Sequence, residues 1–363
     1  MFRPTFRPRG RTGGQRPTEA AIAYNCSNDR TSSSGKPESN FHNQRDNLRQ
    51  SFFFIGLLVA LLLGFTNWIG LAPFATNTFV RGGLVAAILF LTAVTIDLDE
   101  FQSVLRNPFG VGVAFAISFC LIPLIAWLIG RLVDADTRLA ILVMAAAPAT
   151  MSSATVWTAR ANGNQALSLA ISMLSNSLCF LITPLCLAWL AELPPGTSLR
   201  IPTLMGSLLF LVILPITTAQ VVRRHRLVPL LCRRYAGSIS MTVQLGVLIM
   251  ALFGATVTGI RMRDGDTSPT LITVVGVILA VIALRGLGLS CGFGVTRLLG
   301  LPPRDQVAIA IAGSQKTLVV GLQVGIDLGC SILPIVGYHI AQLTIDSVFA
   351  SRFRMAHSQT KDG

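Results

Sequence analysis

One lysine lies where a charged residue is unusual. The chain has three lysines, of which Lys36 and Lys361 are near its ends, whereas Lys316 is followed by a long apolar run. A cation near the centre of a bilayer costs ~2.5–3.5 kcal/mol on insertion scales, so it requires a polar partner or a wet cavity. The alternative is a side chain that extends from near a helix end to the headgroups. The length of the apolar run favours a binding site at Lys316.

Hydroxyl side chains gather after Pro148, at Thr150, Ser152, Ser153 and Thr155. Proline removes a backbone donor and clashes with the preceding turn, so it frees carbonyl groups. At membrane depth those groups must be satisfied by protein, water or an ion. The hydroxyls are therefore candidate ligands for a hard cation or a polar substrate. The alternative is a proline kink whose serines bond back to the helix.

A turn and a polar stripe follow. Asn162-Gly163-Asn164 is typical of a turn, and Asn164 is a suitable N-cap for the next helix. The polar residues after it recur at intervals of three or four, which places them on one helix face; they are Ser168, Ser172, Ser175 and Asn176. Such a stripe either joins neighbouring membrane helices or lines a cavity that faces Lys316.

The last apolar segment carries Tyr338, His339, Gln342 and Asp346. His339, Gln342 and Asp346 fall near one helical face, and we expect Asp346 to lie near the inner membrane interface. A histidine there is either a packed hydrogen-bonding residue or a proton carrier.

Enzyme chemistry has little support in the sequence. Ser314 and His339 are the only candidates for an intramembrane hydrolase, and no phosphate-loop or metal-ligand spacing occurs. The seven cysteines include no CxxC pair or Cys/His cluster. We therefore expect neither an enzyme nor a bound cofactor.

The elements that position these residues are membrane helices. Apolar residues make up 52% of the 363 positions, charged residues 12%, and the mean hydropathy is +0.64. Soluble chains carry roughly 25% charged residues, whereas a helix of ~20 apolar residues matches the hydrocarbon thickness of a bilayer. The sequence therefore predicts an all-α integral membrane protein whose main partner is the lipid bilayer.

Ten spans are expected, at about 52–71, 81–96, 108–130, 138–160, 164–190, 202–222, 238–260, 269–290, 305–325 and 330–350. Ten spans divide into two groups of five, residues 51–195 and 200–355. Because five is an odd number, the second group has the opposite orientation in the membrane, so the two groups form inverted repeats. The fourth and ninth spans are unusually polar, and interrupted spans at matching positions in two repeats predict a binding site at the midplane.

The net charge of +13 follows the topology. Arginines concentrate in residues 1–50, in 223–234 and near the C-terminus, which predicts that both termini are cytoplasmic in a plasma (bacterial inner) membrane. This distribution is not that of a nucleic-acid-binding face. Residues 1–50 are expected to form a disordered basic tail, which either touches anionic lipid or is simply solvated. Residues 356–363 form a second tail.

Three stretches resemble a known family: PATMSSATVWTARANGNQALSLAISMLSNSLCFLITP (148–184), AGSQKTLVVG (312–321) and YHIAQLTIDSVFASR (338–352). They are similar to the SBF-like branch of the bile acid:sodium symporter superfamily, over residues ~50–355. The resemblance implies two inverted five-helix repeats, a panel domain and a core domain, with helices four and nine broken and crossing in the core.

The resemblance also implies where a coupling ion would bind. Matching positions put a possible sodium at Ser153, Ser168, Ser172 and Gln315. However, Ile311 stands where the sodium-coupled members have a glutamate, and Lys316 where they have an asparagine. Loss of an acidic ligand and gain of a cation both disfavour sodium, so Lys316 is expected to replace the charge of a coupling ion or to attract an anion.

We therefore expect a secondary transporter that moves a small solute, an organic anion, by alternating access. The alternative is a non-transporting membrane sensor or regulatory protein on the same scaffold. The substrate/ion-binding residues expected are Ser152, Ser153, Thr155, Asn164, Ser168, Ser172, Asn176, Gln315, Lys316, Thr317, His339 and Gln342.

Overall fold

A computed structural model describes residues 37–67, 70–97, 108–191, 200–264 and 270–359, with side chains from residue 52 to residue 353. Every regular element in these ranges is a helix. Except for the first part of α2, the helices belong to one compact unit that starts at Gly56.

Except for α3 (Ala72–Thr76), which lies between the first two predicted spans, the helices of the first half follow the predicted spans in order. They are α2 (Pro37–Thr66), α3 (Ala72–Thr76), α4 (Thr78–Val94), α6 (Pro108–Ala116), η1 (Ile117–Leu121), α7 (Ile122–Gly130), α8 (Ala135–Ala146), α9 (Ser153–Arg160) and α10 (Gln165–Leu190). Because α2 begins at Pro37, it includes the end of the segment predicted to be a disordered tail. Residues 1–36 of that tail lie outside the described residues.

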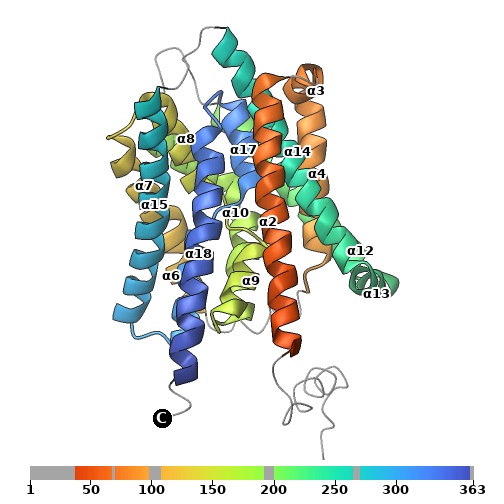
Figure 1. The fold of residues 1–363 in the computed structure, drawn as a ribbon, viewed down its shortest axis with the longest axis vertical. Coiled ribbons are helices and arrows are strands. Elements are labelled where there is room, and N and C mark those ends of the chain that lie inside the picture. Colours follow the sequence, from red (N-terminus) through yellow and green to blue (C-terminus); the bar gives the residue numbers. More distant parts are fainter. Residues whose placement is uncertain (1–36, 68–69, 98–107, 192–199, 265–269, 360–363) are drawn as a thin grey trace, which may run out of the picture. The chain divides into compact units, whose positions relative to one another are not determined.

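The second half has one helix that the sequence did not predict. Its helices are α11 (Ile201–Leu208), η2 (Leu209–Ile213), α12 (Leu214–Arg223), α13 (Leu227–Arg234), α14 (Ala236–Arg263), α15 (Leu271–Leu298), α16 (Pro303–Ser314), α17 (Leu318–Asp327) and α18 (Leu333–Gln359). The short α13 is the addition, and Figure 1 shows it at the end of α12, to one side of the other helices. The last residues of the predicted C-terminal tail, 360–363, lie outside the described residues.

Six segments are long and apolar enough to cross a membrane: Pro108–Gly130, Gln165–Leu190, Ile201–Arg223, Ala236–Arg263, Leu271–Leu298 and Pro303–Asp327. The protein is therefore a multi-pass, all-helical membrane protein, as the composition predicted. The remaining predicted spans contain shorter, broken or more polar helices.

Prolines explain an irregularity in span three. The N–H of Ile122 donates to the carbonyl of Ile117, five residues back, which defines the π-helical turn η1. The next residue, Pro123, has no N–H to offer to the carbonyl of Ser118. Pro215 stands in the same relation to η2 in span six. A π turn of this kind leaves a backbone acceptor for a side chain to satisfy.

The predicted turn at 162–164 is confirmed. Asn162 has φ of 57°, and the Oδ1 atom of Asn164 accepts a hydrogen bond from the N–H of Leu167 at 3.1 Å, which caps α10. Between them, a Cβ on Gly163 would lie 2.8 Å from Cγ1 of Val307, so only glycine lets α9 and α10 approach the start of α16 this closely.

Candidate functional site

The fourth and ninth spans are both broken, and the two breaks meet. Helix α8 ends at Ala146 and α9 begins at Ser153, whereas α16 ends at Ser314 and α17 begins at Leu318. The N–H of Thr317 donates to the carbonyl of Pro148 at 2.9 Å, which joins the two extended segments directly. Each break supplies a backbone group that the other needs.

Side chains of α10 satisfy the rest of the break in span four. The N–H of Ala149 donates to Oγ of Ser175 at 2.8 Å, and Nδ2 of Asn176 donates to the carbonyl of Ala149 at 2.7 Å. Thr183 donates to the carbonyl of Ala146, also at 2.7 Å. Two members of the predicted polar stripe therefore bond to span four.

The break in span nine is held by longer polar side chains. Gln342 of α18 accepts from the N–H of Lys316 at 3.0 Å and donates to its carbonyl at 3.1 Å. The hydroxyl of Tyr338 donates to the carbonyl of Ser314 at 2.7 Å. His339 contacts Gln342: the Nδ1 atom of the histidine is 2.9 Å from the Nε2 atom of Gln342.

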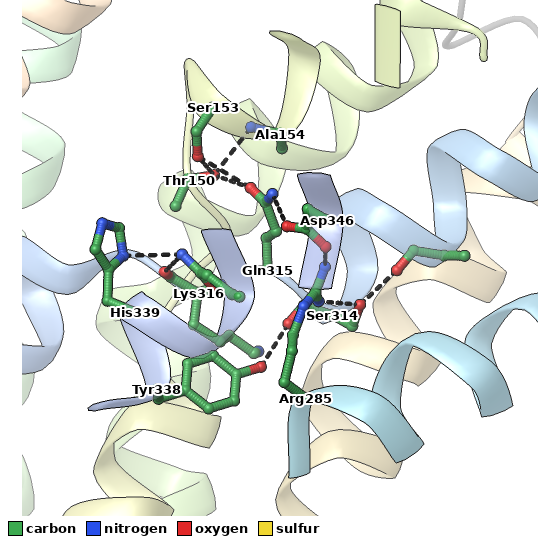
Figure 2. Close-up of polar contacts among 12 residues, drawn as sticks. Thr150, Ser153, Ala154, Arg285, Ser314, Gln315, Lys316, Tyr338, His339 and Asp346 are labelled. Atoms are coloured by element: carbon green, nitrogen blue, oxygen red, sulfur yellow. Dashed lines mark hydrogen bonds and ion pairs between the residues drawn. The ribbon is translucent and has the colours of Figure 1, made fainter. Parts of the chain in front are cut away.

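Gln315 connects the two breaks (Figure 2). Its Oε1 atom accepts from Thr150 at 2.6 Å and from Ser153 at 3.0 Å, and its Nε2 atom donates to Asp346. Asp346 forms an ion pair with Arg285 of α15, which also donates to Ser314. Gln315, Arg285 and Asp346 are all fully buried. A continuous polar chain thus runs from the hydroxyls of span four to a buried guanidinium.

Lys316 is also fully buried, so the prediction that it lies inside the protein is confirmed and extension to the headgroups is wrong. Its ammonium, however, points away from the hydroxyls of span four and toward η1. Nζ donates to the carbonyl of Ser118 at 2.7 Å and to its hydroxyl at 2.9 Å, and lies 5.1 Å from the ring centre of Phe119. The lysine therefore satisfies the carbonyl that Pro123 leaves without a donor.

The other predicted residues are more scattered. The hydroxyl of Thr155 donates to the carbonyl of Met151 at 3.4 Å, as expected if the hydroxyls after Pro148 bond back to their own helix. Asn164 bonds to Asp305 at 2.8 Å, at the far end of α9 from the crossing. Ser172 donates to the carbonyl of Ser168, and the buried Oγ atom of Ser168 has no hydrogen-bond partner.

A cavity of about 450 Å³ reaches the break in span four. Its walls come from α4, α12, α13 and α14, and Ser152 is the residue of the break that lines it; the other lining residues are Leu91, Thr92, Thr95, Asp97, Arg223, Pro229, Cys232, Arg233, Ala236, Ile239, Ser240 and Val243. Arg223 is paired with Asp97 at 2.9 Å, while Arg233 is exposed. The volume falls within the range of small-molecule sites.

The opposite end of α4 is tied to span nine. Arg81, in the first turn of α4, pairs with Asp327 at the end of α17 at 2.8 Å and also donates to the carbonyl of Ala75. Arg261, near the end of α14, donates to the carbonyl of Gly329 just beyond α17. The cavity lies at the end of α4 and the start of α14, so these links lie at the other end of both helices.

Arg285 and the buried position of Asp346 were missed from the sequence. Span eight was predicted to end at about 290, which put Arg285 near a helix end, but α15 continues to Leu298. Asp346 was expected at the interface and is instead fully buried beside the crossing. A charged residue in each of two adjacent apolar helices was the available signal for an ion pair.

Together, the helices and the two meeting breaks define a multi-pass membrane protein with a polar core at mid-span. The chain belongs to the SBF-like CPA transporter family, which it matches over residues 50–355. This is a family of transporters rather than of enzymes, and the resemblance noted in the sequence is confirmed.

Named relatives are similar over much of their length. The chain is 25% identical to sodium/bile acid cotransporter 7-B of Xenopus laevis, over 84% of this chain and 91% of that protein. It is 27% identical to sodium/bile acid cotransporter 7 of Danio rerio, over 83% of this chain and 93% of that protein. It is 28% identical to the uncharacterized sodium-dependent transporter YocS of Bacillus subtilis, over 62% and 66%. The protein is therefore a member of a sodium-coupled transporter family.

Proposed function

We propose that the protein is a secondary transporter that moves a small organic anion by alternating access. It would do so on ten spans arranged as two inverted repeats, residues 51–195 and 200–355. The observation that carries the proposal is the cavity of about 450 Å³ that ends at Ser152, because it connects the break in span four to the outside of the helix bundle. A cavity that reaches the interrupted part of a broken helix is the arrangement expected for a transporter binding site.

The charge around the crossing and the cavity supports an anionic substrate. At the crossing, Arg285 and Lys316 supply two formal positive charges and Asp346 one negative charge, which leaves one positive charge in excess. In the cavity wall, Asp97 offsets Arg223, and Arg233 adds a further cation. A cleft lined with charge of one sign concentrates ligands of the opposite sign.

The same contacts argue against a sodium ion at the crossing. Gln315 and Ser153 bond to each other, and the carboxylate of Asp346 is already neutralised by Arg285. A bound cation would have to displace the guanidinium or share the carboxylate with it. We infer that the buried arginine and lysine take the place of the coupling cation in this chain.

Alternating access requires one end of the pathway to close while the other opens. The ion pair of Arg81 and Asp327 supports such a closure, because it joins α4 to α17 at the end away from the cavity. Along α4, Arg81 is ten residues, or ~15 Å, before Leu91 of the cavity wall. In the proposed cycle this pair breaks when the cavity end closes. The arginine-rich segment 223–234, beside the cavity, supports a cytoplasmic position for the cavity end and for both termini.

The proposal is tested on purified protein in two stages. A thermal-shift screen of organic anions and cations, with and without sodium, identifies ligands. Uptake of each hit is then measured in reconstituted vesicles. We expect stabilisation by an anion without sodium, and uptake that falls to background in Lys316→Ala but not in the control Lys36→Ala. Binding without uptake would favour the sensor alternative, and unaltered uptake in Lys316→Ala would contradict the role of the lysine.

A further inference from the structure

The helix α13 connects two membrane spans at one face of the membrane. Three residues separate the end of the segment Ile201–Arg223 from the first residue of α13, and Ala236–Arg263 begins one residue after Tyr235. Both segments are long and apolar enough to cross a bilayer. The connection between them must therefore lie at the level of the headgroups.

Three leucines of α13 point away from the protein. Leu227, Leu230 and Leu231 are spaced at i, i+3 and i+4, so they share one face, and their side chains are 59%, 62% and 50% exposed. The opposite face packs inward, since Cys232 is buried and its Sγ atom lies 3.6 Å from the carbonyl of Val94. An apolar face that a short connecting helix turns outward is typical of an interfacial helix.

Four exposed arginines precede or follow these leucines in the sequence: Arg224, Arg226, Arg233 and Arg234. The segment from residue 223 to residue 236 contains no aspartate or glutamate to balance them. Arg223 is excluded from the set because it pairs with Asp97. Apolar side chains at headgroup level surrounded by uncompensated cations complement a ligand with an anionic head and an acyl tail.

We propose that α13 and its flanking arginines form a binding site for anionic phospholipids. The guanidinium groups bind the phosphate, and the leucines lie among the acyl chains. Pro229, Cys232 and Arg233 of the same region line the cavity, so a bound lipid fixes one wall of it. The lipid site itself does not depend on the transport activity proposed above.

The test uses the full chain, purified in a neutral detergent and titrated with phosphatidylglycerol or phosphatidylcholine while the melting temperature is measured. We expect phosphatidylglycerol to stabilise the protein more than phosphatidylcholine does. In the variant Arg224→Gln/Arg226→Gln/Arg233→Gln/Arg234→Gln, its apparent affinity should fall at least about tenfold, since each arginine near a charged surface contributes to binding. The substituted side chains are exposed, so this variant should fold.

A matched control loses the same number of exposed arginines elsewhere: Arg131→Gln/Arg200→Gln/Arg297→Gln/Arg304→Gln. It should keep the preference for phosphatidylglycerol. An equal loss in both variants, or equal stabilisation by the two lipids, would overturn the proposal. Stabilisation by glycerol 3-phosphate at the same concentration would overturn it as well, because the site would then bind a soluble anion rather than a lipid.

Discussion

The two broken spans meet through a backbone hydrogen bond, yet different chemistry holds each of them. Apart from its bonds to span nine itself, the break in span four is held by Ser175, Asn176 and Thr183, which are all neutral and all on α10, the next helix in sequence. Around the break in span nine, the partners include the ion pair of Arg285 and Asp346, from two separate helices. One break is a local structure, and the other depends on long-range charge compensation.

This difference suggests different roles for the two halves of the site. Hydrogen bonds between neutral groups in membrane helices contribute about 0.6 kcal/mol on average. A buried ion pair is stable only while both partners are present, because either charge alone is strongly destabilising. We infer that span four provides a fixed frame, whereas span nine responds to any change of charge in the cavity or at the crossing.

The largest expected effect comes from breaking the ion pair. Asp346→Ala leaves Arg285 buried without a counter-charge, so the free energy of unfolding should fall by about 3–5 kcal/mol. Chemical denaturation of the purified protein measures it. The double variant Arg285→Met/Asp346→Leu should recover most of the loss, since it leaves no buried charge. If Asp346→Ala is as stable as the wild type, the break in span nine does not depend on charge compensation, and the two breaks do not differ in this respect.

A smaller effect is expected at the neutral break. Asn176→Ala removes the donor to the carbonyl of Ala149, which should lower the free energy of unfolding by about 1–2 kcal/mol. The control Ser177→Ala lies on the same helix and bonds only within it, to Met173, so it should change the same quantity by less than about 0.5 kcal/mol. If Asn176→Ala lowers the free energy of unfolding as much as Asp346→Ala does, the break in span four is not held by weaker, neutral contacts.

Several features of the two breaks could be predicted from the sequence, because interactions between neighbouring residues determine them. Pro148 interrupts a helix wherever it occurs in one, and the turn at 162–164 has a single suitable N-cap in Asn164. Burial of Lys316 followed from its position in an apolar run. Membership in the family followed from stretches in spans four, five, nine and ten.

The partners of the buried charges could not be predicted in the same way. Lys316 was expected to share a binding site with the hydroxyls of span four, but its partner is a carbonyl in η1 that is available only because Pro123 follows. Arg285 and Asp346 are 61 residues apart, and nothing local indicates that α15 and α18 bring them together. Similarly, the cavity combines four helices of which α13 was not predicted. Tertiary packing, rather than spacing along the chain, determines these contacts.

The smallest expected effect concerns the far end of span nine, where Asp327 pairs with Arg81. This pair is partly exposed, so solvent weakens it to roughly 1 kcal/mol, about a fivefold change in an equilibrium. Asp327→Asn should therefore shift the protein toward the state in which this end is open. Two native cysteines report the shift: Cys330 is buried three residues after Asp327, and Cys232 lines the cavity. In single-cysteine backgrounds, the labelling rate of Cys330 relative to Cys232 should rise about fivefold.

The matched control for that experiment is Asp305→Asn. Asp305 is at the start of the same broken span, and its partner is Asn164 rather than a residue of α4. Neutralising it removes an equal charge without affecting the link to α4, so the labelling ratio should stay unchanged. A ratio that rises equally in both variants would mean that charge anywhere on span nine controls its position. A ratio that rises only in Asp327→Asn would show that span nine is restrained by an ion pair that must break during the cycle.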